Sequence, residues 1–208
     1  MDFSISMALV DYIPVAFFAI AAVILMRDLY NKMSKGAFAL FAAGTIDITV
    51  AGALKATYKL LYAAGICNFE ALNGMFFPTQ SIGFLLAGIG ILAMICHNQT
   101  EKTSLMAVIP PVFKGTFVFV GLMVAGLGLI DTVLCILAVK LKRPYLIALF
   151  AVSFVCSLCM GYLSSKDFAD AAMNWIAEGV NVVGQGALLS GAYMMHKNGL
   201  ADLSLREE

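Results

Sequence analysis

Long apolar runs separated by short polar segments extend through the whole chain. A hydrocarbon core of ~30 Å is crossed by ~20 apolar residues in a helix that rises ~1.5 Å per residue. Backbone groups in lipid find no water to bond with, so runs of this length favour α-helices. The pattern predicts an all-α transmembrane bundle with spans over residues 8–26, 37–56, 76–96, 115–139, 144–163 and 172–195.

The apolar stretch 105–139 is too long for one crossing and slightly short for two crossings with a turn. Proline is favoured in a first helical turn, so a helix that begins near Pro111 leaves residues 105–109 as an interfacial or re-entrant segment. That interpretation gives six spans. The Lys and Arg distribution favours seven, because seven spans place most basic residues on one side with the N-terminus outside. We prefer six spans on length and keep seven as the alternative.

The two halves of the chain are weakly similar. The sequence ALFA occurs at 39–42 and again at 148–151, and segments 75–98 and 173–198 each run to a histidine near their end. We therefore consider a three-helix duplication, with half-repeats at 8–98 and 112–198, inside a single transmembrane domain that covers 1–208. Six spans would make such a repeat inverted and seven would make it parallel, and secondary transporters use both arrangements.

Composition agrees with a membrane protein and excludes an ordinary soluble domain. Of the 208 residues 62% are hydrophobic and 12% charged, whereas soluble domains are about 45–50% apolar and about 25% charged. The formal net charge is zero and the basic residues are scattered, which argues against nucleic acid as a partner. We expect a multi-pass protein of the plasma (inner) membrane whose first span acts as its targeting signal.

Three acidic residues of the predicted spans stand out as candidates: Asp47, Asp131 and Glu178. An ionisable group at membrane depth costs about 2.5–3.5 kcal/mol on insertion scales and usually faces a bundle interior or a wet cavity. Asp47 and Asp131 share helical faces with glycines, which favours an orientation toward protein. All three are candidates for a substrate or ion site, and each is also compatible with a purely structural role.

A polar stripe runs along the last predicted span. Glu178, Asn181 and Gln185 are spaced i, i+3 and i+7, so they lie on one helical face. Gln80 is a weaker counterpart in the third span. These residues predict either a binding site for a solute or ion, or hydrogen bonds that hold the helices together.

Other polar residues carry weaker indications. Lys55 and Lys59 stand near the end of the second span, where we expect them to snorkel to the headgroups. Cys156 and Cys159 have the spacing of thiol oxidoreductases but lie in an apolar span, which favours packing. No metal or cofactor is expected, since the two histidines follow distant apolar spans and no phosphate-binding loop occurs.

The sequence favours a small permease or channel-like carrier. Its expected site is formed by Asp47, Asp131, Glu178, Asn181, Gln185 and Gln80, and acidic and amide groups favour a cation, a proton-coupled solute or a small polar solute. The alternative is a non-transporting subunit or sensor that binds a partner protein, and the third is a thiol oxidoreductase using Cys156 and Cys159. The motifs give no support to an enzyme of another kind. Small-residue helix faces leave a homo-oligomer open.

Overall fold

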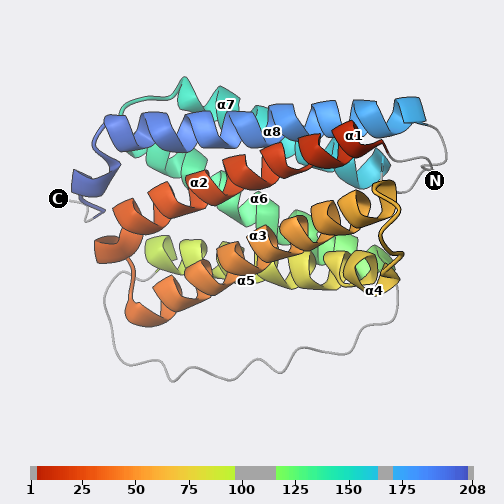
Figure 1. Ribbon diagram of the computed structural model, residues 1–208. Helices are drawn as coiled ribbons and strands as arrows, with labels where there is room; N and C mark the ends of the chain where they lie inside the picture. The colour runs from red at the N-terminus through yellow and green to blue at the C-terminus, as the bar shows by residue number, and fades with distance from the viewer. Residues whose placement is uncertain (1–3, 97–115, 164–170, 206–208) are drawn as a thin grey trace.

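The computed structural model describes residues 4–96, 116–163 and 171–205, and all regular structure in these ranges is helical (Figure 1). Each predicted span falls on one of its six long helices. The segment 105–109, expected to be interfacial or re-entrant, lies outside the described residues. The helices are α1 (Ile5–Val10), α2 (Tyr12–Leu29), α3 (Lys35–Ala63), α4 (Glu70–Gly74), α5 (Phe76–Cys96), α6 (Thr116–Lys140), α7 (Leu146–Leu163) and α8 (Ala171–Lys197), with 3-10 turns at Tyr30–Lys32 and Leu200–Asp202.

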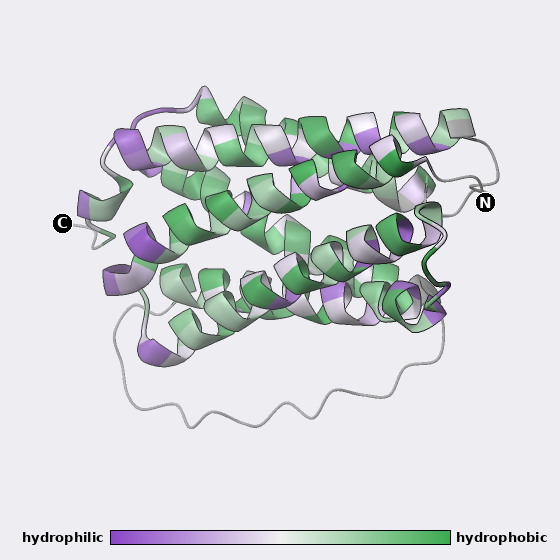
Figure 2. Cartoon of the chain, in the orientation of Figure 1, coloured by the Kyte–Doolittle hydropathy of each residue, from purple (hydrophilic) through white to green (hydrophobic). Residues whose placement is uncertain are grey.

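Most residues of these helices are apolar, as the predominance of green in Figure 2 shows. Four helical segments of the described chain are long and apolar enough to cross a membrane: Ile5–Lys32, Lys35–Ala63, Glu70–Cys96 and Val118–Lys140. Leu146–Met160 is a shorter apolar helix, and α8 is the least hydrophobic of the long helices because it carries the polar stripe. The expectation of a helical membrane protein is thus met at this level.

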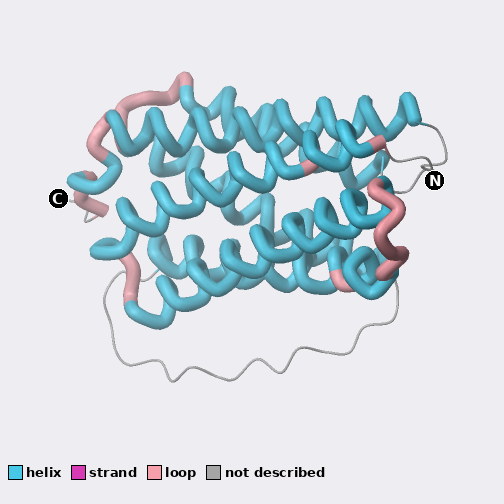
Figure 3. Tube along the Cα trace, viewed as in Figure 1, coloured by secondary structure: helices cyan, strands magenta, loops and turns pink. Residues whose placement is uncertain are grey.

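The six long helices form a closed ring. Along the chain α2 packs on α3, α3 on α5, α5 on α6, α6 on α7 and α7 on α8, and α8 closes the ring against α2. Helices α2, α5, α6 and α8 run in one direction, while α3 and α7 run in the other, as the trace in Figure 3 allows the reader to follow. We call the end of the bundle where α2 begins the Asp11 end, and the end where α2 stops the Asp28 end.

Helices α5 and α6 are neighbours in sequence order and lie parallel to each other. A Cβ atom on Gly126 of α6 would lie 2.3 Å from the carbonyl carbon of Phe84, and one on Gly88 of α5 would lie 3.1 Å from Cβ of Leu129. The contact positions increase together along both helices, as parallel packing requires. Glycine makes this approach feasible because it has no side chain to separate the two backbones.

The helix trio α2, α3, α5 therefore has the same order of directions as the trio α6, α7, α8. The close contacts between the second and third helices of one trio match those of the other trio. The contacting residues are separated by the same number of positions along the corresponding helices. In each case a glycine of the third helix faces the backbone or side chains of the second. The corresponding contacts are Gly83 with Gly44 and Asp47, Gly184 with Ser153 and Cys156, Gly90 with Phe41, and Gly191 with Phe150.

The hydrophobic core is concentrated at the Asp28 end. Most of its largest fully buried side chains lie where α2, α5, α6 and α8 end and where α3 and α7 begin; Met7 of α1 is an exception. They include Leu29, Phe41, Ile91, Leu134, Leu137, Leu146, Phe150 and Met195. Interiors packed in this way leave few voids larger than a water molecule, so the bundle is closed at the Asp28 end.

Candidate functional site

The Asp11 half of the ring contains a cavity. Its empty volume, including the open mouth, is about 1020 Å³, and all six long helices contribute residues to its lining. Most of the wall is apolar. The apolar residues are Pro14, Val15, Phe18, Ile48, Phe76, Phe77, Phe84, Met123, Val124, Leu127 and Met160, and the polar ones are Asp11, Thr49, Lys55, Gln80, Ser157, Glu178, Asn181 and Gln185. A mostly apolar cavity with a few polar groups is typical of small-molecule sites.

A buried ion triad joins three helices beside this cavity. The Lys59 ammonium lies 2.6 Å from Asp11 Oδ2 and 2.7 Å from Glu178 Oε1, and all three residues are buried. Asp11 occupies the junction of α1 and α2, Lys59 belongs to α3 and Glu178 to α8. The expectation that Lys59 snorkels to the headgroups is wrong, because two acids from other helices compensate its charge inside the protein. Breaking such a pair would leave an uncompensated buried charge.

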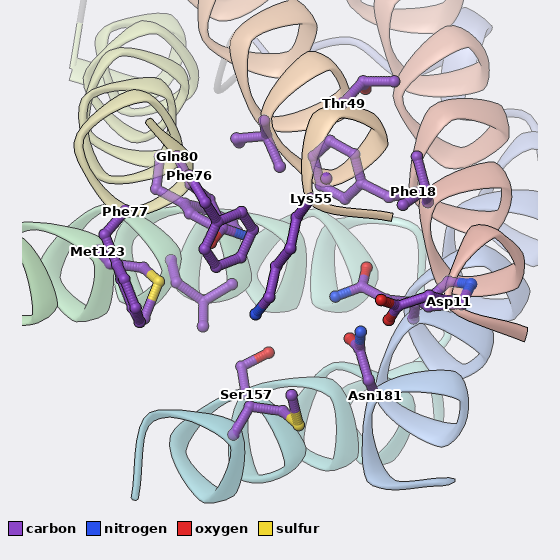
Figure 4. Close-up of a pocket in the computed structure, with 18 of the residues that line it drawn as sticks. Asp11, Phe18, Thr49, Lys55, Phe76, Phe77, Gln80, Met123, Ser157 and Asn181 are labelled. Carbon is purple, nitrogen blue, oxygen red and sulfur yellow. The ribbon is translucent and has the colours of Figure 1, made fainter. Parts of the chain in front are cut away.

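Lys55 lies one helical turn before Lys59 and extends into the cavity. Its ammonium is 4.0 Å from the centroid of the Phe76 ring, a cation–π contact. Figure 4 shows the side chain directed toward Ser157 and Asn181. Among the described residues no carboxylate lies within ion-pair distance of this ammonium, and it donates no hydrogen bond. Lys55 therefore presents a positive charge to whatever occupies the cavity.

The predicted site residues are brought together only in part. Glu178, Asn181 and Gln185 of α8 and Gln80 of α5 all line the cavity. Asp47 does not, because it is half-buried on α3 beside Gly83.

Asp131 of α6 also lies outside the cavity lining. It is 5% exposed and follows the lining residue Leu127 by one helical turn. Neither of its carboxylate oxygens has a hydrogen-bond partner in the described parts of the chain.

Sequence reasoning missed Asp11, Lys55 and Lys59 as site residues. Asp11 falls inside the first predicted span, which is itself a signal, since acids at membrane depth are costly. Lys55 and Lys59 are four residues apart and therefore share a helical face. Two lysines on one face, together with an acid in each of two other spans, would have indicated buried ion pairs between helices rather than two snorkelling side chains.

A second polar cluster seals the Asp28 end, again between α2 and α8. His196 Nδ1 lies 2.9 Å from Asp28 Oδ2, and Arg27 Nη2 lies 2.7 Å from His196 Nε2. Arginine is always a donor, so Nε2 accepts from Arg27 while the Nδ1 hydrogen is donated to Asp28. Lys32 then ties the C-terminal segment down through the carbonyl oxygens of Ala201 at 2.8 Å and Leu203 at 2.6 Å.

Thiol and metal chemistry have no geometric support in this bundle. Cys156 faces Gly184 at the α7–α8 contact, Cys159 is exposed, and neither lines the cavity. Within the described residues no group of three or more potential metal-ligating side chains is found.

The chain matches no protein-family model, and neither a curated protein nor a solved structure is significantly similar to it. Function is therefore argued from the cavity and the helix arrangement.

Proposed function

We propose that this protein is a small multi-pass carrier that binds a solute in the cavity and exposes it alternately to the two sides of a membrane. The observation that carries the proposal is the asymmetry of the bundle along its axis. Residues of all six long helices line the cavity in the Asp11 half, while large buried side chains close the Asp28 half. This is the geometry expected of a carrier in one of its two states.

The two helix trios supply a means of switching between states. Their identical order of directions and their corresponding glycine contacts support an internal repeat of the parallel kind. In carriers built from such repeats, the halves rock against each other around a site at their interface. Here the cavity lies between the halves, which meet at the α5–α6 and α8–α2 contacts.

Helix directions favour seven crossings over the six preferred on length. Helix α5 ends at the Asp28 end and α6 begins at the Asp11 end (Figure 1). If both cross the bilayer in the same direction, the six long helices cannot be its only crossings, which favours the seven-span alternative. Seven crossings also make the two half-repeats parallel, in agreement with the helix trios.

The charge distribution orients this seven-span arrangement. The described basic residues outside the cavity gather near the Asp28 end: Arg27, Lys32, Lys35, Lys140, Lys142, Arg143 and Lys197. At the Asp11 end of the described helices the basic residues are Lys55 and Lys59, which serve the interior. By the positive-inside rule the Asp28 end faces the cytoplasm. The cavity would then be accessible from outside a plasma membrane.

Accessibility of single cysteines tests alternating exposure. In a variant without its five native cysteines, Ser157→Cys places a thiol in the cavity and Leu134→Cys places one in the closed core. A lipid-facing control is Val155→Cys, whose native side chain is 56% exposed. In intact cells, we expect a membrane-impermeant thiol reagent to label position 157 quickly from outside. Position 134 should label slowly from the cytoplasmic side of inverted vesicles, and position 155 from neither side.

The rival function, a sensor or non-transporting subunit, makes a different prediction in the same assay. Position 157 would be labelled, but position 134 would stay protected from both sides over hours, because the closed core never opens. That result would contradict the carrier proposal. Labelling of position 157 from the cytoplasmic side alone would contradict the proposed orientation.

A further inference from the structure

The charges around the cavity balance before any ligand is bound, but they are not evenly paired. Asp11 and Glu178 are both engaged with Lys59. Lys55, the other cation, is left with the Phe76 ring as its contact. A cation–π contact is worth less than a buried ion pair, because the ring offers a quadrupole rather than a full charge. An anionic group would be a better partner for Lys55 than anything the described residues provide.

Amide groups near Lys55 are also available to a ligand. Gln80, Asn181 and Gln185 line the same cavity, and none makes a hydrogen bond with another described residue. Each amide offers two N–H donors. An ammonium and several amide donors facing one space are suited to the two oxygens of a carboxylate.

The rest of the cavity wall favours a ligand whose remaining part is apolar. Phe18, Phe76, Phe77 and Phe84 combine with Met123, Leu127 and Met160 to form a largely apolar lining. Such a wall gains free energy by removing apolar ligand surface from water, about 25 cal/mol for each Å² buried. A small inorganic anion would leave this wall without a partner. A molecule with an apolar body would fill it.

We infer that the cavity binds a small organic acid as its carboxylate, with Lys55 as the counter-charge and an aromatic or branched aliphatic body against the phenylalanines. The inference deepens the proposed carrier function and depends on it for the direction of movement, but not for binding itself. It replaces the cation favoured by acidic and amide residues alone, because both acids at the cavity are already engaged in ion pairs with Lys59.

Binding to the purified protein in lipid nanodiscs tests the ligand class. The acid probes are phenylacetate and 4-methylpentanoate, measured by isothermal titration calorimetry at pH 7.5. The matched neutral and cationic probes are phenylacetamide and 2-phenylethylammonium. We expect saturable binding of at least one acid, with the amide and the ammonium at least about tenfold weaker, since hydrogen bonds to charged groups contribute about 1.5–3 kcal/mol.

Substitution then assigns the counter-charge. Lys55→Gln should weaken acid binding by about 10- to 100-fold, the range expected for loss of a charged hydrogen-bonding partner, with phenylacetamide binding little changed. Lys197→Gln is the matched control, because Lys197 also lies over an aromatic ring, 4.9 Å from the Tyr193 centroid, but away from the cavity. It should bind acids like the unaltered protein. Asn181→Leu, which keeps Lys55, should cause an intermediate loss.

Uptake separates the ligand inference from the carrier proposal. Proteoliposomes and protein-free liposomes are compared for uptake of radiolabelled phenylacetate and 2-phenylethylammonium. Lys55-dependent acid binding without protein-dependent uptake would support the ligand class and contradict the carrier. Protein-dependent uptake of the ammonium and not of the acid would support the carrier and overturn the ligand class. The inference is also overturned if neither acid binds, or if Lys55→Gln binds acids unchanged.

Discussion

Buried charged side chains are paired differently at the two ends of the helix ring. At the Asp11 end a lysine and two acids are fully internal and border a cavity. At the Asp28 end the side chain of Asp28 is buried while its partners Arg27 and His196 reach the surface, and large apolar residues fill the space beneath. Asp11 and Asp28 are about 25 Å apart by helical rise. In the proposed carrier, the two clusters would hold the same α2–α8 seam near opposite faces of a ~30 Å hydrocarbon layer.

The comparison teaches that the two seams between the helix trios differ in kind. Glycines bring α5 and α6 into backbone contact, and such a contact is steric and changes little with conditions. The α2–α8 seam is held at both ends by ionisable groups, which can exchange partners. In the proposed carrier, α5–α6 is therefore the fixed hinge and α2–α8 the seam that opens.

Loss of the central cation of the Asp11 end should have the largest effect on stability. Lys59→Met leaves Asp11 and Glu178 buried without their cation, and removing one partner of a buried pair costs about 3–5 kcal/mol. We expect this loss in the free energy of unfolding, measured by reversible denaturation in detergent micelles. The triple variant Asp11→Asn, Lys59→Met, Glu178→Gln should recover much of it. Failure of the triple variant to recover would mean that Lys59 stabilises through its packing and not through its charge.

The hinge at α5–α6 should be the next most sensitive point. A Cβ at Gly126 would lie 2.3 Å from backbone atoms of Phe84, while one at Gly121 on the same helix meets no described atom within 4 Å. Overpacking of this kind costs about 1–3 kcal/mol, so Gly126→Ala should destabilise the protein. Gly121→Ala should be neutral or stabilising by up to ~1 kcal/mol, since alanine favours helix over glycine. Equal effects on the unfolding free energy would argue against a steric hinge.

The helices were predictable because apolar runs of fixed length leave the backbone few alternatives in lipid. The second predicted span ended at 56, whereas α3 continues to Ala63. The reason is that two lysines close together in the sequence usually mark the end of a span. The partner that buries Lys59, Glu178, is 119 positions away in the sequence. The stripe on α8 could be predicted because helical periodicity is local. No local sequence pattern predicts which helices pair, or that α5 and α6 run parallel.

At the Asp28 end, removal of the histidine should cost less than removal of the lysine at the other end. His196→Ala takes away the imidazole that donates to Asp28, but Arg27 Nε stays 3.5 Å from the same carboxylate. We expect a loss of about 1–3 kcal/mol, the cost of an unsatisfied buried acceptor. In the accessibility assay, position 134 should label faster in this variant. Unchanged labelling would contradict a role for the cluster in holding this end closed.

The smallest stability effect should come from Lys55, one turn from the residue with the largest. Lys55→Gln removes an ammonium that has no ion pair among the described residues and whose contact is the Phe76 ring. A cation–π contact is worth about 0.5–2 kcal/mol, and loss of a partly desolvated charge offsets it, so the unfolding free energy should change by less than about 1 kcal/mol. Lys59→Met would then cost severalfold more unfolding free energy than Lys55→Gln. For acid binding the order would be reversed, with the larger loss on Lys55→Gln. A large loss of stability on Lys55→Gln would mean that this lysine stabilises the helix packing at the Asp11 end and does not serve as a ligand-binding residue.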